Sequence, residues 1–382
     1  MDQLTFTKKT DQSIGPSAEN LANALGISPE ELDEALQIPS AQRYIPFTVS
    51  GGTRVVYRTH SRIKFIQQKI KNRILADCIN YPKYVFGSIK DPDFKRDYVN
   101  CAAQHCGARS LLKVDIEKFF DNISIGNVRR IFRDLLHYPD PVCSMLCDLT
   151  THNGYLPQGA PTSSHLATLC FFKEEPDIVE QAQAQGLVYT RLMDDITVSS
   201  KSYDYDFHRL ERLIRNMIET KDLTVNEGKS ETFPTVSSTT LVHGLKINTE
   251  TLRVSDKTLS NIRAAINQLE KDAKQPNKRT LSNYRKRYER TSGSLSVLHR
   301  LGHPKYEKYR RKLRRLRPLP SPYFLNKTWE LMESIENIQD MRESAIYRKR
   351  FYMLHHKLNL AQRTFKAEAK TMRERLKEIK PK

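Results

Sequence analysis

Hydrophobic residues follow a helical period over much of the first 80 positions. The segment 65–79 (FIQQKIKNRILADCI) has apolar residues spaced about 3.6 apart, which predicts a helix. The segment 18–36 (AENLANALGISPEELDEAL) predicts two shorter helices. Ser28 can cap the second of them, because Pro29 suits its first turn and Glu31 stands three residues after the cap, as in a capping box.

An extended, basic stretch at 43–62 lies between these helices. The pair Gly51-Gly52 stands there between β-branched runs and predicts the turn of a hairpin.

From about residue 110 the pattern alternates between short strands and helices. The nearly apolar SLLKVDI predicts a strand, and VYTRLMDDITVSS predicts two strands joined at Asp194-Asp195. Helices are expected at 127–138, at 163–185 with a break near Pro176, and at 207–221, and further strands at 223–233 and 239–248. The order strand–helix–strand–strand–helix–strand is typical of a split βαβ, ferredoxin-like sheet covered by helices on one face. The fold class is therefore predicted as α+β.

The chain beyond about residue 255 has a helical pattern and becomes strongly basic. Residues 301–317 carry eight Lys or Arg and one Glu. The proline-rich segment RPLPSP that follows resembles a linker. The remaining tail, 326–382, is helical in pattern, is mixed in charge and contains the only tryptophan, Trp329.

Charge and hydropathy narrow the class of protein. The 382 residues include 63 Lys or Arg and 44 Asp or Glu, a net charge of +19, which is expected of a protein that binds a phosphate backbone or an acidic membrane face. No segment approaches the roughly 18–20 continuous apolar residues of a membrane span, and the N-terminus has no apolar signal region. We therefore expect a cytoplasmic protein with no membrane partner. The six cysteines lack zinc-site spacing and are expected to be reduced thiols.

Three features carry the candidate chemistry. Asp115 lies near the end of a strand, Asp194 and Asp195 lie at a hairpin turn, and the segment 156–164 (LPQGAPTSS) lies between them. Taken alone, Asp115 can be an acceptor of local hydrogen bonds, the Asp pair an ordinary solvated turn, and the proline-rich loop a rigid turn. Neighbouring strands of the predicted sheet, however, can bring the three carboxylates together. Such a cluster recruits Mg²⁺ or Mn²⁺, and two ions about 4 Å apart promote nucleotidyl transfer.

These segments resemble the motifs of reverse transcriptases, and within that group those of bacterial retrons. VDIEKFFDNI is similar to motif A, LPQGAPTSS to motif B of retron and group II intron polymerases, YTRLMDDITVSS to motif C and LTVNEGKSETF to motif D. LVHGLKIN stands where the primer-grip strands lie, and TRVVYRTHSRIKFIQ resembles the first fingers motifs. The resemblance covers residues 20–317 and implies a right-hand polymerase with fingers, a ferredoxin-like palm and a helical, basic thumb.

Two retron signatures are present in altered form. CAAQH (101–105) replaces an NAxxH element, so Cys101 stands in place of Asn, and VHG (242–244) replaces a VTG triplet, so His243 stands in place of Thr. The resemblance assigns both elements, including His105 and His243, to recognition of a structured RNA; a satisfied structural histidine is the alternative for His105. Motif C has Leu192 in place of the usual Tyr, which keeps the apolar volume and loses the hydroxyl. Because both aspartates remain, we expect activity.

The resemblance implies a role for each motif residue. Asp115, Asp194 and Asp195 are the expected catalytic metal ligands for two Mg²⁺ ions, with the backbone carbonyl of Ile116 completing the set. The expected nucleotide-binding residues are Arg54 at the triphosphate, Phe120 as a steric gate against a ribose 2′-OH, Gln158 and Gly159 beside the nucleotide and template, and Lys229 as proton donor to the pyrophosphate. A surface charge is the alternative for Arg54 and Lys229, and core packing is the alternative for Phe120.

The basic helices at 285–317 fit a thumb that follows phosphates, with Arg310, Arg311 and Arg314 expected at the RNA; a solvated charge run is the alternative. The expected divisions are an N-terminal helical segment (1–45), fingers (46–109), palm (110–254), thumb (255–320) and a C-terminal extension (321–382).

The resemblance implies a retron RNA-directed DNA polymerase. Such an enzyme binds a cognate non-coding RNA and uses dNTPs to copy part of it, from an RNA 2′-OH primer, into RNA-linked single-stranded DNA (msDNA). The family commonly works with an effector protein in anti-phage defence, and the extension is a candidate contact for that effector or for the product. The alternatives are an abortive-infection or other defence-associated reverse transcriptase, a group II intron relative and a non-catalytic RNA-binding scaffold. The intron hypothesis is the weaker one, because no maturase tail or HNH nuclease motif is found in the sequence.

Overall fold

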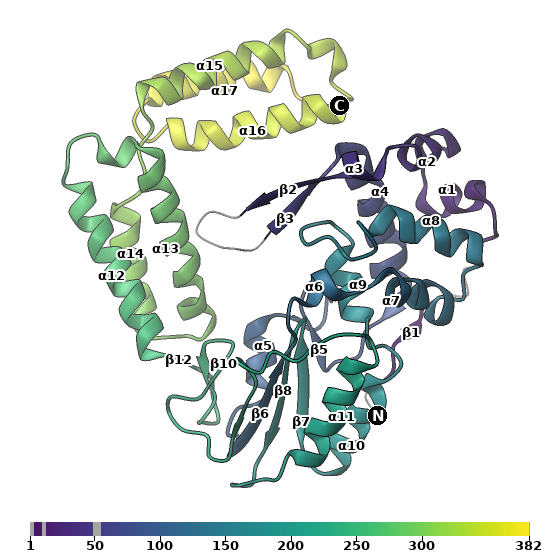
Figure 1. Cartoon of the computed structure of the whole chain (residues 1–382). Helices are drawn as coiled ribbons and strands as arrows, with labels where there is room; N and C mark the ends of the chain where they lie inside the picture. Colours follow the sequence, from purple (N-terminus) through teal and green to yellow (C-terminus); the bar gives the residue numbers. More distant parts are fainter. Residues whose placement is uncertain (1–3, 10–12, 49–54, 382) are drawn as a thin grey trace. The chain divides into compact units, whose positions relative to one another are not determined.

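The computed structural model describes residues 4–9, 13–48 and 55–381, which form two compact units, Met1–Arg253 and Val254–Lys382 (Figure 1). The proposed hairpin turn at Gly51-Gly52 and the position of Arg54 lie outside the described residues.

A five-stranded sheet organises the first unit. Its order is β5-β7-β8-β6-β9, with β5 (Val85–Phe86) parallel to β7 and all other neighbours antiparallel. The other strands are β6 (Ser110–Asp115), β7 (Val188–Leu192), β8 (Asp195–Ser200) and β9 (Glu231–Phe233). The order β7-β8-β6-β9 is that of a ferredoxin-like sheet, which confirms the α+β prediction.

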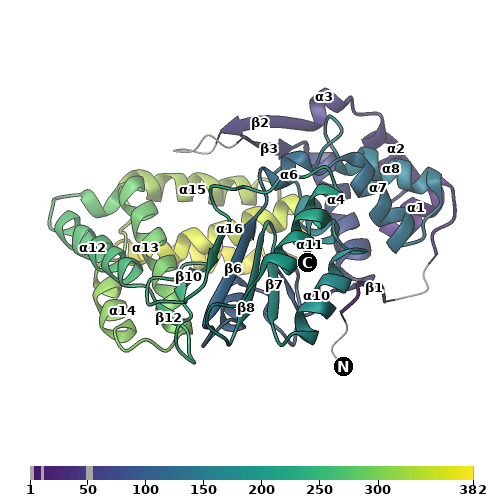
Figure 2. The ribbon, with the colours of Figure 1, turned by 60° about the horizontal axis from the view of Figure 1, so that its bottom comes forward.

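Two helices, α10 (Glu175–Ala184) and α11 (His208–Glu219), pack against each other and lie on one face of this sheet (Figures 1 and 2). The break before α10 falls at residues 170–174, and Pro176 lies in its first turn, where a missing N–H costs nothing. Beneath α10, Arg191 of β7 and Glu175 form a fully buried ion pair, with the Arg191 Nε 2.6 Å from the Glu175 Oε1. The Tyr189 hydroxyl donates to the same carboxylate.

The first unit contains further helices and two short pairs of strands. The expected helix at 65–79 is present as α4 (Ser61–Ile70) continued by a π-helical segment, η1 (Lys71–Ala76), and the expected helix at 127–138 as α7 (Ile125–Arg130) continued by π-helical η2 (Ile131–Leu135). The other helices are α1 (Ala18–Leu25), α2 (Pro29–Leu36), α3 (Ser40–Arg43), α5 (Tyr98–Ala103), α6 (Phe119–Asn122), α8 (Asp140–Thr150) and α9 (Ser163–Leu169). The other strands are β1 (Thr7–Lys8) paired with β4 (Ile79–Asn80), and β2 (Tyr44–Thr48) paired with β3 (Val55–Thr59).

The capping box predicted for α2 is confirmed. Glu31 N–H donates to the Ser28 hydroxyl at 3.2 Å, and Ser28 N–H donates to the Glu31 carboxylate at 3.0 Å. Each side chain therefore satisfies a backbone donor that the first helical turn leaves without a partner.

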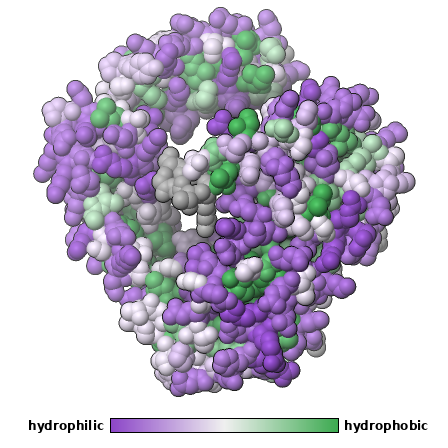
Figure 3. Space-filling model, in the orientation of Figure 1, coloured by the Kyte–Doolittle hydropathy of each residue, from purple (hydrophilic) through white to green (hydrophobic). Residues whose placement is uncertain are grey.

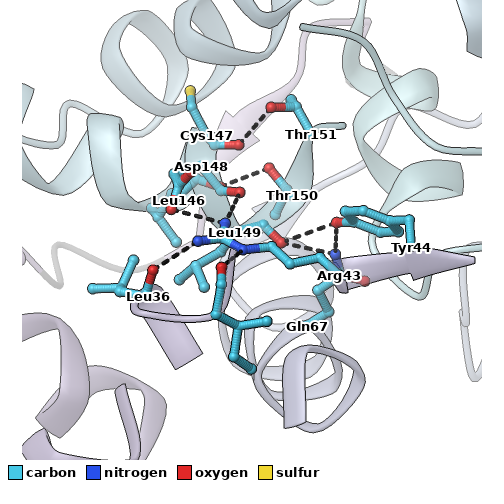
Figure 4. A network of polar contacts seen from close by, with 11 residues as sticks. Leu36, Arg43, Tyr44, Gln67, Leu146, Cys147, Asp148, Leu149, Thr150 and Thr151 are labelled. Atoms are coloured by element: carbon cyan, nitrogen blue, oxygen red, sulfur yellow. Dashed lines mark hydrogen bonds and ion pairs between the residues drawn. The ribbon is translucent and has the colours of Figure 1, made fainter. Parts of the chain in front are cut away.

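A polar network fixes the start of β2 against α8 (Figure 4). Arg43, which is 4% exposed, donates to the carboxylate and the backbone carbonyl of Asp148 and to the carbonyls of Ile38 and Leu36. Gln67 of α4 donates to the Leu149 carbonyl and to the Tyr44 hydroxyl. The bonds to Asp148 and Leu149 join residues more than 80 positions apart, so the sequence pattern could not reveal them.

Two segments differ from the expected strands. Residues 239–248 form a tight hairpin, β10 (Leu241–Val242) and β11 (Leu245–Lys246), rather than one strand. Its turn residues, His243 and Gly244, both have positive φ, and glycine adopts such a φ without strain. In 223–233 only β9 is a regular strand, because residues 227–229 form a turn before it.

The second unit is helical and follows the strand β12 (Arg253–Val254), within which the two units divide. Helices α12 (Asp256–Ala273), α13 (Ser282–Arg300) and α14 (Tyr306–Arg315) share one apolar core, joined by the 3₁₀ turn η3 (Lys278–Thr280). A second core joins α15 (Pro322–Glu336), α16 (Ala345–Ala361) and α17 (Lys366–Glu378), with η4 (Gln339–Met341) between the first two. The face drawn in Figure 3 is mostly hydrophilic. Across the described ranges, no helix is long and apolar enough to cross a membrane.

Candidate active site

The three candidate carboxylates meet at one end of the five-stranded sheet. Asp115 ends β6 and pairs in register with Asp195, the first residue of β8. Asp194 lies in the β7–β8 turn after Met193, whose φ is 59°. The Ile116 N–H donates to the Asp194 carbonyl at 3.0 Å and holds this turn beside β6. The sequence prediction that neighbouring strands bring these residues together agrees with this geometry.

Asp115 is held by the turn that precedes β9. The Asn226 side-chain amide donates to its Oδ2 at 3.0 Å, and the Lys229 ammonium lies 3.1 Å from the same oxygen. The Asp115 N–H donates to the Ser230 hydroxyl. Lys229 of motif D therefore contacts the carboxylate cluster, a contact that the sequence did not predict. Asn226 was missed by sequence reasoning, although it stands three residues before Lys229 in the same turn.

The other two carboxylates have opposite pKa shifts. Burial, together with the negative charges of Asp115 and Asp195, raises the pKa of Asp194 above its usual value. Burial also acts to raise the pKa of Asp195, but a hydrogen bond from His243 and the nearby charges of His243 and Lys113 lower it below the usual value. Crowded carboxylates of this kind favour binding of a cation, which offsets their mutual repulsion.

The donor set fits a hard divalent cation in its chemistry, because it consists of carboxylate oxygens on a rigid sheet end. The side chains, however, are not arranged to coordinate an ion in this structure. Among the described residues, no group of three or more His, Cys, Asp or Glu is placed to hold a metal ion. Asp115 and Asp195 are instead bonded to Lys229 and His243.

A cavity of about 350 Å³ opens beside the carboxylates. Six of the residues predicted from the motifs line it together: Asp115, Ile116, Phe120, Gln158, Asp194 and Lys229. Phe119 and Phe120 both line this cavity, but Phe119 is buried and stacks on Phe171, whereas Phe120 is only partly buried. The two adjacent phenylalanines thus differ in burial, and Phe120 is the more exposed of the two at the cavity.

The motif B loop lies against β3. The Tyr57 N–H donates to the Gln158 carbonyl at 2.8 Å. Gly159 has a φ of +102°, and a Cβ at this position would lie 3.1 Å from the Tyr57 carbonyl oxygen. A side chain here would be both strained and crowded, so the loop requires glycine.

His105, an expected RNA contact, does not face solvent in this structure. The residue is 1% exposed, and its ring nitrogens contact the Ser199 and Thr190 hydroxyls at 2.7 and 2.8 Å. Burial lowers the pKa of His105 to about 3, so its ring is neutral at physiological pH. The alternative of a satisfied structural histidine describes this position.

The two altered retron elements contact each other beside the active site. The His243 Nε2 lies 3.2 Å from the Cys101 Sγ, and its Nδ1 lies 3.4 Å from the Asp195 Oδ2. Burial raises the pKa of Cys101 to about 12, so this residue is a thiol, which also contacts Thr190 at 3.3 Å. His243 thus touches a candidate metal ligand, a contact that sequence reasoning did not predict.

The expected RNA-binding arginines belong to α14 in the second unit. Arg310 and Arg314 line a cavity of about 400 Å³ with Tyr288 and Tyr306. Arg311 does not line it and directs its Nε toward the Glu307 carbonyl. All three guanidinium groups are carried by an exposed helical face.

Comparison with known proteins identifies the family. A family model described as "Reverse transcriptase (RNA-dependent DNA polymerase)" matches residues 45–243, which is more than half of the chain. Retron Ec48 reverse transcriptase from Escherichia coli is 36% identical over 100% of this chain and 96% of its own length. Retron Se72 reverse transcriptase from Salmonella heidelberg (strain 579083-10) is 30% identical over 81% of this chain and 82% of its own length. A solved telomerase from Candida albicans matches with a TM-score of 0.37 and 11% identity, over 88% of this chain and 66% of that chain. The resemblance inferred from the motifs is confirmed: the chain belongs to the reverse transcriptases, the RNA-directed DNA polymerases, and among them to the retron type.

Proposed function

We propose that this reverse transcriptase binds a cognate structured non-coding RNA and copies part of it into single-stranded DNA that stays linked to the RNA. The observation that carries the proposal is the meeting of Asp115, Asp194 and Asp195 at one end of the sheet, beside a cavity, in a chain related to retron enzymes over its full length.

Reverse transcriptases depend on divalent metal ions. In this proposal Asp115, Asp194, Asp195 and the carbonyl of Ile116 hold two Mg²⁺ ions, for which Mn²⁺ can substitute. The ions supply activation of the attacking hydroxyl and stabilisation of the leaving pyrophosphate. The raised pKa of Asp194 supports this assignment: burial is its main cause, the negative charges of Asp115 and Asp195 add to it, and a bound cation would offset both.

The cavity residues complete the proposed nucleotide site. Phe120 blocks a ribose 2′-OH, so the site prefers dNTPs, and Gln158 and Gly159 border the nucleotide and the template. Lys229 protonates the leaving pyrophosphate; its ammonium lies 3.1 Å from the Asp115 carboxylate, within reach of the reacting groups. Arg54 contacts the triphosphate.

The finer family properties belong to the same proposal. A 2′-OH of the cognate RNA primes synthesis, so the msDNA carries a 2′,5′ linkage. Arg310, Arg311 and Arg314 bind the RNA, His243 acts at the border between RNA recognition and catalysis, and an effector protein joins the complex in anti-phage defence. The divisions at residues 45, 109, 254 and 320 remain predictions for the N-terminal segment, fingers, palm, thumb and extension.

The test is purification of the full chain from cells that carry its native locus, followed by extraction of the bound nucleic acid. The sample is treated separately with RNase, DNase and a 2′,5′-debranching enzyme. D194N/D195N is the inactive variant, and D33N, which changes an exposed carboxylate on α2, is the matched control. We expect an RNA-linked single-stranded DNA from wild type and D33N, and RNA without DNA from D194N/D195N.

Other outcomes contradict the proposal in different ways. DNA without linked RNA, or DNA made without a template, favours an abortive-infection type of reverse transcriptase. RNA-linked DNA that persists in D194N/D195N contradicts the assignment of the carboxylates. RNA without DNA from both wild type and the variant favours the scaffold alternative. DNA that the debranching enzyme does not release from RNA contradicts priming from a 2′-OH.

A further inference from the structure

A cavity of about 370 Å³ lies within the second unit, between α13, α15 and α16 and the turn after α16. Its walls combine cations with aromatic and apolar groups. Arg285 and Tyr288 come from α13, Phe324 from α15, Lys357 from α16 and Arg363 from the following turn. None of these residues lines the cavity that contains Asp115 and Asp194.

The cations are arranged around one aromatic ring. The Arg285 guanidinium carbon lies 5.0 Å from the centre of the Phe324 ring, and the Lys357 ammonium lies 5.5 Å from it. Arg363 donates to the Pro318 carbonyl at 2.9 Å, which fixes its guanidinium at the same cavity. The ring quadrupole attracts both cations and holds them close together, although their like charges repel.

No carboxylate balances this charge. Within 55–381, neither Arg285, Lys357 nor Arg363 forms an ion pair. The negative charge of Glu330 acts to raise the pKa of Lys357, but the Glu330 carboxylate is paired with the Lys327 ammonium at 2.6 Å. Glu289 also lines the cavity but is exposed and pairs with none of the three. Burial and the charge of Arg285 lower the pKa of Lys357, and burial with the charges of Arg317, Arg285 and Arg279 lowers that of Arg363.

A buried donor at this cavity also lacks a partner. The Arg285 Nε is buried and makes no hydrogen bond within the described structure. Buried polar atoms normally have a partner, so an orphaned donor beside a cationic cavity indicates a place for an acceptor. A phosphate oxygen is a suitable acceptor, because the planar guanidinium matches its geometry.

The ligand must combine negative charge with a flat apolar part. Tyr288, Phe324, Met353 and Leu360 offer ring and aliphatic surface beside the cations, and pockets of about 300 Å³ and upward suit small organic ligands. We propose that this cavity is a second nucleotide site, in which Arg285, Lys357 and Arg363 bind the phosphate of a nucleoside phosphate and the aromatic wall contacts its base. The nucleotide is either free or part of a nucleic-acid strand. The proposal does not depend on msDNA synthesis, because it rests on residues of the second unit alone.

The test is calorimetric binding to the full-length protein in buffer with EDTA, where the metal-dependent nucleotide site is not loaded. The probes are inorganic phosphate, dAMP and a 5′-phosphorylated (dT)₈. The variants are K357Q and R285Q, which remove a charge, K357R, which keeps it, and F324L, which keeps apolar volume without the ring. K349Q is the matched control, because Lys349 is exposed on the same helix and does not line the cavity.

We expect saturable dAMP binding to wild type, K349Q and K357R. K357Q and R285Q should each weaken it at least about tenfold, the effect of losing one charge-assisted hydrogen bond. F324L should weaken dAMP binding more than phosphate binding. Because Lys357 lies among like charges, K357Q should keep a thermal midpoint close to that of wild type, which separates loss of binding from unfolding.

The oligonucleotide identifies the source of the nucleotide. Binding of (dT)₈ that is much tighter than that of dAMP, and that is weakened equally by K357Q and R285Q, assigns the site to a nucleic-acid strand. Equal affinities assign it to a free nucleotide. Absence of saturable binding by all probes, or binding that K357Q and R285Q leave unchanged in folded protein, overturns the proposal.

Discussion

The two units of this reverse transcriptase use charge in opposite ways. Residues 1–253 contain 30 Lys or Arg and 31 Asp or Glu, whereas residues 254–382 contain 33 Lys or Arg and only 13 Asp or Glu. The net charge of the chain thus comes from the second unit. The first unit buries charges inside its fold, among them Arg43, Arg191 and Glu175, while Asp272 is the buried charged residue among those described in the second.

The difference reflects what each unit must do. The first unit must hold three carboxylates at fixed positions, and its buried polar networks hold the strands and loops around them. The second unit has two ordinary apolar helical cores and presents its cations at the surface, where they can attract phosphates over a distance set by salt. In this protein, internal charge therefore holds the elements around the carboxylates in place, whereas the excess of cations of the second unit is mostly external.

The largest effect on stability is expected from breaking the buried pair in the first unit. E175Q leaves the Arg191 guanidinium buried without its counter-ion, so the free energy of unfolding should fall by about 3–5 kcal/mol. The matched variant in the second unit is E307Q, which breaks the exposed pair with Arg310 and should cost about 1 kcal/mol or less. Urea denaturation measures both, and equal costs would contradict the contrast between the units.

The charge of the second unit should determine how RNA binding depends on salt. R310Q/R311Q/R314Q removes three cations, so the slope of log K against log salt concentration should become less steep by roughly 2–3. K173Q/R209Q/R212Q removes the same charge from exposed positions of the first unit and should change the slope less. Filter binding with the cognate RNA at several salt concentrations tests this, and equal changes would show that both units contact phosphates.

The crowded carboxylates of the first unit should make stability depend on pH. The folded-state pKa of Asp194 lies above its ordinary value, so ionising this group opposes folding. In buffer with EDTA, wild type should lose stability relative to D194N as the pH rises through the ordinary pKa of Asp and then the raised one, by about 1 kcal/mol or less. Thermal unfolding across pH 3–8 is the measurement. A constant difference between the two proteins would contradict a raised pKa of Asp194.

The smallest effect is expected where the two altered retron elements meet. His243 contacts both Cys101 and Asp195, so H243A and C101A should not act independently. A double-mutant cycle on unfolding free energy should show a coupling of about 0.5–1 kcal/mol. C78A, at a buried cysteine that does not contact His243, is the control partner and should give additive effects. If the effects of H243A and C101A on the unfolding free energy also add, the contact between His243 and Cys101 does not contribute to stability.

Local signals predicted most of the elements correctly. The Ser28 and Glu31 cap needs only residues three apart, and the strand and helix order from 110 to 233 implies the ferredoxin-like sheet. The hairpin at 239–248 was missed because its strands have two residues each, too few for periodicity to show. The burial of His105 was not predicted, because a motif gives the position of a residue along the chain and does not give its burial.

The sequence by itself determined the family, the order of strands and helices from 110 to 233, and the convergence of Asp115, Asp194 and Asp195, because these follow from short-range patterns and motifs. The tertiary structure decided the partners of the buried charges. It placed Arg43 against Asp148, Arg191 against Glu175 and His243 against Asp195, and it gathered Arg285, Lys357 and Arg363 at one cavity that Phe324 also lines. Most of these contacts join residues far apart in the chain. Their energies depend on burial and on distances of a few ångströms, and only the packed fold sets these.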